Sequence, residues 1–331
     1  MRSRGQSAGI AMLVLIALVT AAAPAVAPHD PGRQFADLTY APPMPPRILD
    51  AAGHWRPPFV YPLRLVDRLE RRFAEDREHP VTLQWFSSGA MVSADDSAGP
   101  WLPLGGDALG RDIFARVVRG ARLSLGVSIV AAAGALLIGV VLGAAAGYSR
   151  PAIDNLLMRI ADFVLVLPAI YVVILLRSAM PLVLSTPRAF WTMAAILALA
   201  GWPYPALGVR AIVAGERRKE YAESARAIGA GWWRILLHHL LPATTGYLAV
   251  QATLLLPAFI LAEATLSFVG FGFAEPAPSW GVMLHEGGQA SALADAPWLL
   301  APAAAIAICV MAVYLAAGSS ASSRSTFLGR G

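Results

Sequence analysis

Long runs of apolar residues, separated by short polar segments, dominate the pattern of this chain. A membrane-spanning helix needs about 20 mostly apolar residues, because it rises about 1.5 Å per residue across roughly 30 Å of hydrocarbon. Six stretches meet this requirement and predict an all-α integral membrane protein with six transmembrane helices. They are Ile10–Ala27, Leu123–Ala146, Phe163–Leu184, Phe190–Leu207, Tyr247–Gly270 and Trp298–Ala317.

Small residues and prolines give these stretches further character. Lipid provides no hydrophobic drive for helix association, so small residues favour close packing between spans. The second stretch is uncharged and contains Gly134, Gly139, Gly143 and Gly147. Pro168 in the third stretch, and Pro203 and Pro205 in the fourth, predict kinks that neighbouring helices tolerate.

The basic residues of the short loops predict which side each loop occupies, because cytosolic loops carry an excess of Lys and Arg. With a cytosolic N-terminus, the short outer loops hold only Arg177 and Arg188. The inner segments then hold twelve basic residues: Arg2, Arg4, Arg150, Arg159, Arg210, Arg217, Arg218, Lys219, Arg226, Arg234, Arg324 and Arg330. Both termini are therefore expected in the cytosol. Arg2, Arg4 and the small residues Ala25-Val26-Ala27 leave open that the first stretch is a cleavable signal peptide.

An external segment of about ninety residues separates the first two stretches. It opens rich in proline, which disfavours regular structure, and continues with a predicted amphipathic helix, Leu63–Glu78, with Leu65, Leu69 and Phe73 on one face. We expect a small cap or an interface with a partner, in preference to a separate catalytic domain. No catalytic triad or carboxylate pair is visible, and the scattered His29, His54 and His79 form no metal-ligand set.

Composition narrows the class of protein. Hydrophobic residues make up 57% of the 331 residues and charged residues only 14%, against about 25% charged in a soluble domain. The single cysteine excludes a disulfide framework and cysteine-based metal sites. Lys219 is the only lysine and follows Arg218. A P-loop places its lysine between Gly and Ser or Thr, so this chain does not bind ATP through a Walker motif.

The loop spanning residues 208–243 is the most informative polar segment. It predicts a short helix from Glu220, slim because of Ala222, Ala225 and Ala227, which could lie in a groove on another protein. Gly229 permits the positive φ that ends a helix. A second helix follows, with Trp232, Ile235, Leu236 and Leu240 expected along the bilayer interface. An interfacial loop without a docking role is the alternative.

This loop resembles the EAA loop of ABC importer permeases. The resemblance rests on Glu223-Ser224-Ala225, Gly229 and Leu241-Pro242, with Ser224 at the second Ala position of the family pattern. In that family the loop docks into a cytosolic ATPase. The resemblance therefore implies an ATPase-coupling role for Glu220, Ala222, Glu223, Ser224, Ala225, Gly229, Leu241 and Pro242.

Further motifs resemble the dipeptide, oligopeptide and nickel permeases within that family. Gly106-Asp107-Ala-Leu-Gly110-Arg111-Asp112 resembles their motif before the second span, with Gly106 in place of Thr. Residues 266–272 (Leu-Ser-Phe-Val-Gly-Phe-Gly) and 278–281 (Pro-Ser-Trp-Gly) resemble the loop after their fifth span. Arg159, Asp162 and Pro168 match the start of their third span. The resemblance covers about residues 104–300 and implies the type I ABC importer permease fold.

Glu263 lies within the fifth apolar stretch, where a carboxylate is costly and faces protein or water. We favour a structural or gating role over substrate recognition. An ion-coupled secondary transporter with Glu263 as proton site is the alternative function. It predicts inverted repeats, and no matching halves are visible. A membrane-bound enzyme would need a cluster of polar residues, and none is evident.

The resemblance implies a non-enzymatic permease subunit in the bacterial inner membrane, with no cofactor, no metal and no nucleic acid partner. Peptides are favoured over nickel as cargo, because soft or imidazole ligands are few. Implied partners are a second homologous permease, one or two ABC ATPases, an extracytoplasmic binding protein and the lipid bilayer. The chain divides into residues 1–27, an external segment 28–120, a five-helix core 121–318 and a cytosolic tail 319–331.

Overall fold

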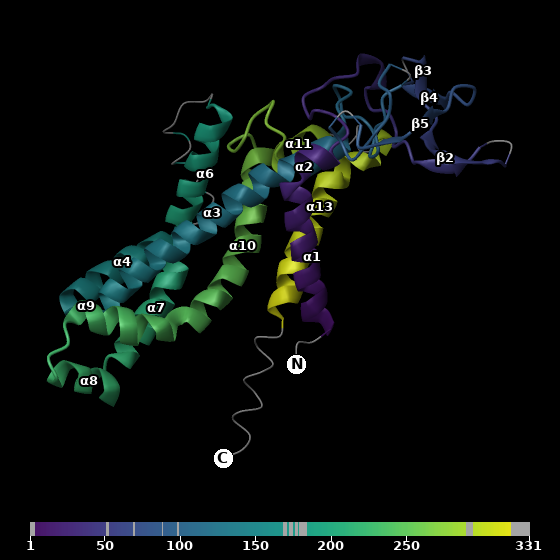
Figure 1. Cartoon of the computed structure of the whole chain (residues 1–331). Helices are drawn as coiled ribbons and strands as arrows, with labels where there is room; N and C mark the ends of the chain where they lie inside the picture. Colours follow the sequence, from purple (N-terminus) through teal and green to yellow (C-terminus); the bar gives the residue numbers. More distant parts are fainter. Residues whose placement is uncertain are drawn as a thin grey trace. The chain divides into compact units, whose positions relative to one another are not determined.

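A computed structural model describes residues 4–50, 53–68, 70–87, 89–97, 99–167, 171, 175, 178, 184–288 and 294–318 (Figure 1). The chain divides into two compact units, Met1–Leu125 with Ala264–Ala316, and Gly126–Glu263 with Ala317–Gly331. Two long helices, α3 (Ile113–Tyr148) and α10 (Thr245–Phe268), contribute residues to both units.

The predicted membrane helices are present wherever the structure describes them. Helices long and apolar enough to cross a membrane are Arg4–Ala21, Ile113–Tyr148, Trp232–Phe268 and Pro297–Ala317, and the bent pair α6 (Thr186–Gly201) and α7 (Pro203–Glu216) can form a fifth span. The 45° bend of this pair falls directly before Pro203, which confirms the predicted kink. The third predicted span, including Pro168, lies mostly outside the described residues. Its first part belongs to α4 (Pro151–Val166).

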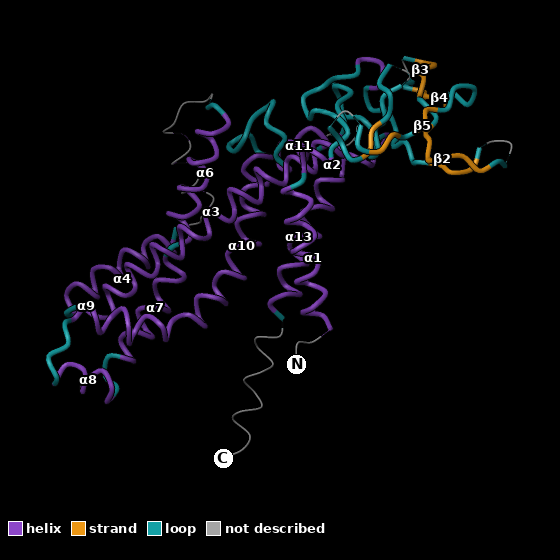
Figure 2. The backbone as a smooth tube through the Cα atoms, in the orientation of Figure 1, coloured by secondary structure: helices purple, strands orange, loops and turns teal. Residues whose placement is uncertain are grey.

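The first unit combines helices with a segment of short strands, which Figure 2 shows in orange. Its helices are α1 (Arg4–Ala21), α2 (Ala23–Val26), α11 (Trp280–Gly287) and α13 (Ala301–Ala317), with 3₁₀ turns η1 (Ala36–Leu38) and η4 (Pro297–Leu300). Helices α1 and α13 meet at Gly9, where a Cβ would collide with the backbone of Ala316. Arg122 donates to the carbonyls of Thr20 and Ala21 at the end of α1.

The described part of the external segment contains seven short strands, which the sequence did not predict. They are β1 (Arg47–Leu49), β2 (Trp55–Val60), β3 (Leu63–Asp67), β4 (Arg72–Glu75), β5 (Val81–Thr82), β6 (Gln84–Trp85) and β7 (Val92–Ser93). They pair antiparallel as β1-β2-β5, β3-β4 and β6-β7. Pro57 and Pro58 lie within β2, at an irregularity in its register with β1, where missing N–H donors cost least.

The predicted amphipathic helix Leu63–Glu78 is wrong, because β3 and β4 form a hairpin there. Leu65 and Phe73 do share a face, but as directly opposite residues on paired strands rather than on successive helical turns. Exposed and half-buried positions alternate along both strands. This period of two indicates a strand, and Leu69 lies outside the described residues.

The second unit is held together by the glycines of α3, which confirms their predicted role in close packing. A Cβ at Gly139 would lie 2.5 Å from Pro205, and one at Gly147 would lie 2.7 Å from the carbonyl oxygen of Arg210. Gly134 faces Ala198 of α6, and Gly143 faces the carbonyl of Ala206 in α7. Backbone-to-backbone approach of this kind is possible only without side chains.

Helix α4 packs on α7 beside this contact. Ala161, Trp202 and Ala206 form a buried cluster that Ile138, Leu142 and Val164 complete. The Asp154 carboxylate accepts two hydrogen bonds from Arg210, at 2.9 Å from Nε and 2.6 Å from Nη2. Helices α3, α4 and α7 therefore form one frame.

We expect Gly143→Ala to destabilise this frame, although alanine favours a helix by up to about 1 kcal/mol over glycine. The new methyl group meets the Ala206 carbonyl, and overpacking costs about 1–3 kcal/mol. Gly215→Ala in α7 is the matched control, because no atom lies within 4 Å of its Cβ position. Thermal unfolding of the purified protein in detergent measures both, and equal melting temperatures for the two variants would contradict the packing argument.

Candidate functional site

The first part of the predicted 208–243 loop, residues 208–216, belongs to α7, so the loop is shorter than the sequence predicted. Its remainder folds as a helix, a glycine turn and a second helix, as predicted. Helix α8 (Glu220–Ala227) ends before Gly229, whose φ is +85°. Helix α9 (Trp232–Ile235) then continues through a π-helical turn, η2 (Leu236–Leu240), and a 3₁₀ turn, η3 (Leu241–Thr244), into α10. Pro242 has no N–H to donate to an earlier carbonyl, which accounts for the irregular turns on either side of it.

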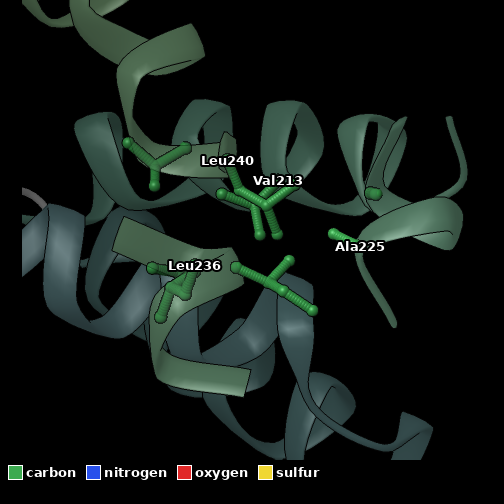
Figure 3. Packing of buried hydrophobic residues seen from close by; sticks show 8 residues of the cluster. Val213, Ala225, Leu236 and Leu240 are labelled. Atoms are coloured by element: carbon green, nitrogen blue, oxygen red, sulfur yellow. The ribbon is translucent and has the colours of Figure 1, made fainter. Parts of the chain in front are cut away.

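A buried cluster fixes this loop to the frame of the second unit (Figure 3). Ala144 of α3, Val209 and Val213 of α7, and the α8 and α9–η2 residues share it: Ala222, Ala225, Ile235, Leu236 and Leu240. Ala222 is 0% exposed and Ala225 is 8% exposed. The small side chains of α8 therefore bring the helix close to its own chain, whereas the sequence suggested that they fit a groove on another protein.

The opposite face of α8 points to solvent. Its exposed residues are Glu220, Tyr221, Glu223, Ser224, Arg226 and Ala227, and Ile228 directly after the helix is 86% exposed. The two glutamates lie in the first turn, where their charge complements the helix dipole. A hydrogen bond to Glu216 raises the pKa of Tyr221 to about 12, so the phenol stays protonated and bound.

The second half of the loop differs from the expected interfacial helix. Ile235, Leu236 and Leu240 are buried in the cluster, and Leu241 packs against it. Of the four residues expected at the bilayer interface, only Trp232 is exposed. Their helical spacing is equally typical of a face that packs on protein, which the sequence could not distinguish.

The Gly106–Asp112 motif forms a tight, buried turn in the first unit. Asp107 accepts hydrogen bonds from the backbone N–H groups of Leu109 and Arg111 and from the Arg111 side chain. Gly110 has a φ of +71°, and a Cβ there would collide with the carbonyl of Phe35, so only glycine fits.

This turn holds one end of an ion cluster, which we define as Asp107, Arg111, Arg116, Glu275 and Glu286. Its two guanidinium groups are buried, whereas the Glu275 side chain is 41% exposed. Arg111 donates to Glu275 at 2.5 Å and to Glu286 at 2.6 Å. Arg116 donates to Glu275 at 2.7 Å, to Glu286 at 2.8 Å and to Asp107. The cluster joins the start of α3 to the segment before α11 and to α11 itself.

The cluster contains three carboxyl groups for two guanidinium groups. Burial and the hydrogen bond to Glu275 raise the pKa of Glu286 to about 7. Although burial opposes it, the hydrogen bond from Glu286 and the charges of Arg116 and Arg111 lower the pKa of Glu275. Below about pH 7, Glu286 therefore holds a proton, which leaves two carboxylates beside the two guanidinium groups.

Asp112 lies beside this cluster and has a separate structural role. Its carboxylate accepts hydrogen bonds from the N–H groups of Phe114 and Ala115, which caps the start of α3. It also bonds His29 at 3.0 Å, while the other ring nitrogen of His29 lies 3.1 Å from Asp96. Burial opposes the effect, but these two carboxylates raise the pKa of His29.

The loop after α10 packs against the first turns of α3. The N–H of Trp280 donates to Ser124 at 3.1 Å, and its indole donates to the carbonyl of Val117 at 2.9 Å. Ser279 caps α11 through Val282. The two motifs that flank the 208–243 loop in sequence therefore meet in the first unit.

Glu263 is fully buried in α10.

The sequence did not predict a role for Arg116, Glu275 and Glu286, which lie up to 170 residues apart along the chain. It also gave no role to Arg217, which contacts the end of α3. Charged residues close to apolar stretches were the available signal, but their partners could not be deduced from spacing.

The raised pKa of Glu286 predicts that the stability of the folded protein depends on pH. A carboxyl group with a pKa of 4.5 when unfolded and about 7 when folded retains a proton in the folded state across that window. Stability therefore falls as pH rises from about 4.5 to 7, by at most about 1.4 kcal/mol per pH unit for one proton. Glu286→Gln should flatten this decline, as measured by melting temperatures in detergent between pH 5 and 8.

His29 contributes a decline in the same direction, because its raised pKa gives stability that is lost as pH rises through the folded pKa. The difference between the wild type and Glu286→Gln isolates the contribution of Glu286. Parallel pH profiles for the two proteins would show that Glu286 holds no proton in this range.

The chain is similar in sequence to known transport proteins. The chain is 43% identical over 191 residues to the dipeptide transport system permease protein DppC of Bacillus subtilis, covering 58% of this chain and 57% of that protein. It therefore spans less than two thirds of that relative's length. The oligopeptide transport system permease protein OppC of Bacillus subtilis is 35% identical over 215 residues, covering 65% of this chain and 68% of that protein.

A solved structure, the MetNI methionine ABC transporter in an inward-facing conformation, is similar at a TM-score of 0.47 and 18% identity, over 62% of this chain and 94% of that chain. This likeness is too weak to support an argument. The model of one family, described as binding-protein-dependent transport system inner membrane component, matches residues 139–321. That match covers more than half of the chain, so this protein belongs to the family of binding-protein-dependent transport system inner membrane components.

Proposed function

We propose that this protein is the permease subunit of an ATP-driven importer of peptides, and that it docks onto a cytosolic ATPase through α8. It performs no catalysis and forms half of the translocation pathway. A second homologous permease supplies the other half, an extracytoplasmic binding protein delivers the cargo, and one or two ATPases hydrolyse ATP. The names of the similar dipeptide and oligopeptide permeases support peptides as cargo.

The observation that carries this proposal is the two-sided character of α8. Its alanine face is anchored in the buried cluster, whereas its glutamate face is exposed. Tyr221 donates to Glu216 at the end of α7, and Arg226 donates to the carbonyl of Arg217 directly after α7. A short helix fixed on one side and charged on the other suits a docking contact, because little conformational entropy is lost on binding.

The orientation belongs to the same proposal. Both termini and the 208–243 loop lie in the cytosol, and the external segment lies outside, in accord with the distribution of basic residues. Under this topology Glu263 serves packing or gating in α10, where its burial supports a protein environment for the carboxyl group.

Two substitutions in the loop test docking. Glu223→Lys reverses an exposed charge at the contact, where like-charge juxtaposition can cost several kcal/mol. Gly229→Val places a β-branched residue at φ +85° with no atom near its Cβ, so the change strains the backbone without a clash. Each should reduce co-purification of the ATPase and peptide uptake roughly tenfold or more, since a strained backbone residue costs on the order of 1–3 kcal/mol.

Gly229→Asn is the matched control, because asparagine tolerates positive φ, and it should retain most of the ATPase. Glu78→Lys, an exposed glutamate in the external segment, controls for the charge reversal. Wild-type amounts of ATPase bound to both Glu223→Lys and Gly229→Val would refute the coupling role of α8.

Single cysteines test the topology. A cysteine in place of Glu75 should react with an impermeant thiol reagent in intact cells, and one in place of Arg218 should react only after the membrane is opened. Cys309 is buried and is first replaced by alanine to remove background. Labelling at position 218 in unbroken cells would reverse the proposed orientation.

A further inference from the structure

The corner between α3 and α4 is gripped by a side chain from outside both helices. The last carbonyl groups of a helix have no partner within it. At the end of α3, Nη1 of Arg217 lies 3.2 Å from the carbonyl oxygen of Gly147 and 3.0 Å from that of Tyr148, and it lies 3.2 Å from the carbonyl oxygen of Ser149, the residue directly after the helix. A positive charge at this place also complements the helix dipole.

Arg217 stands where the 208–243 loop leaves α7. It follows the last residue of α7, and only Arg218 and Lys219 separate it from α8. The guanidinium of Arg226, in the last turn of α8, donates to the backbone carbonyl of Arg217. The backbone carbonyl of Arg217 therefore accepts a hydrogen bond from α8, while its side chain contacts the end of α3.

The part of the loop that follows α8 also contacts the end of α3. The guanidinium carbon of Arg217 lies 5.9 Å from the centre of the Tyr148 ring, and the ring of Trp232 in α9 lies 6.4 Å from it. The final residue of α3 thus contacts residues that precede and follow α8. A displacement of α8 would change both contacts together.

Arg210, within α7, contacts the other side of the corner at the start of α4. Arg210 lies seven residues before Arg217, which is two helical turns, so both side chains leave the same face of α7. Arg210 binds Asp154 in the first turn of α4 through two parallel hydrogen bonds. Such a fork-to-carboxylate pair fixes direction as well as distance.

We infer that Arg217 and Arg210 are positioning residues that clamp the α3–α4 corner to α7, so that a movement of α8 is delivered to α3 and α4. This inference rests on the proposed docking of an ATPase on α8. It adds the route by which the movement leaves the loop. Arg217 carries the link from α8 to α3, and Arg210 keeps α4 moving with them.

The test uses the complete transporter in proteoliposomes and measures peptide imported per ATP hydrolysed. Arg217→Gln should keep the ATPase bound and its hydrolysis within about twofold of wild type, while peptide imported per ATP falls about tenfold. Arg217→Lys should restore part of this ratio, because an ammonium group can still donate to the carbonyls. Arg218→Gln removes the same charge one residue away, at an exposed position, and should keep the wild-type ratio.

Arg210 is tested by a charge exchange with its partner. Asp154→Arg and Arg210→Asp should each lower the ratio, and the double variant should recover it, since the pair is re-formed in reverse. Recovery shows that the loss in each single variant comes from the broken pair, and it decides the test if Arg217→Gln does not fold into the membrane.

An unchanged ratio in Arg217→Gln, an equal loss in Arg218→Gln, or absence of recovery in the double variant would overturn the inference. Loss of the ATPase from Arg217→Gln would also overturn it, because Arg217 would then shape the docking surface instead of transmitting its movement. If the wild-type complex itself retains no ATPase, the proposed function fails, which is a separate outcome.

Discussion

The close approach of α3 to α6 and α7 is the contact on which the second unit depends. Four glycines of α3 face backbone or small side chains, and three of them would bring a Cβ to within 2.7 Å or less of a neighbouring atom. In a membrane such contacts replace the hydrophobic drive that water provides elsewhere. They place α7 so that Arg210, and Arg217 directly after the helix, contact the α3–α4 corner. Val209 and Val213 of α7 then pack against the alanines of α8.

The first unit, by contrast, contains buried charged side chains. Two arginines with 4% and 1% side-chain exposure are surrounded by three carboxyl groups, Asp107 from the same turn and Glu275 and Glu286 from a distant part of the chain. Burying unpaired charge is costly, so each arginine has several acceptors and one carboxyl group retains a proton. The Gly106–Asp112 motif supplies the geometry, because its glycines let the backbone turn tightly enough to present Asp107 to both arginines.

Much of this structure could be predicted from the sequence, and the failures have physical causes. Length and apolarity identified the spans, and glycine content identified the packing face of α3. The hairpin at Leu63–Glu78 was misassigned because apolar residues at a spacing of eight suit both a helical face and opposite positions on paired strands. The alanines of α8 were rightly seen as a close-packing face, but the sequence could not show that the partner is the chain's own core. Contacts such as that of Arg217 with Gly147, 70 residues apart, depend on the tertiary fold.

The ion cluster and the Arg210–Asp154 pair respond differently to acidity. Arginine keeps its charge at any pH a cell encounters, and Asp154 is held ionised by Arg210, whose hydrogen bonds lower its pKa. The grip of α7 on the α3–α4 corner is therefore constant across the physiological range. The cluster around Glu286 gains and loses a proton near neutrality. Acidification would therefore change the protonation of the ion cluster and leave the Arg210–Asp154 pair unchanged.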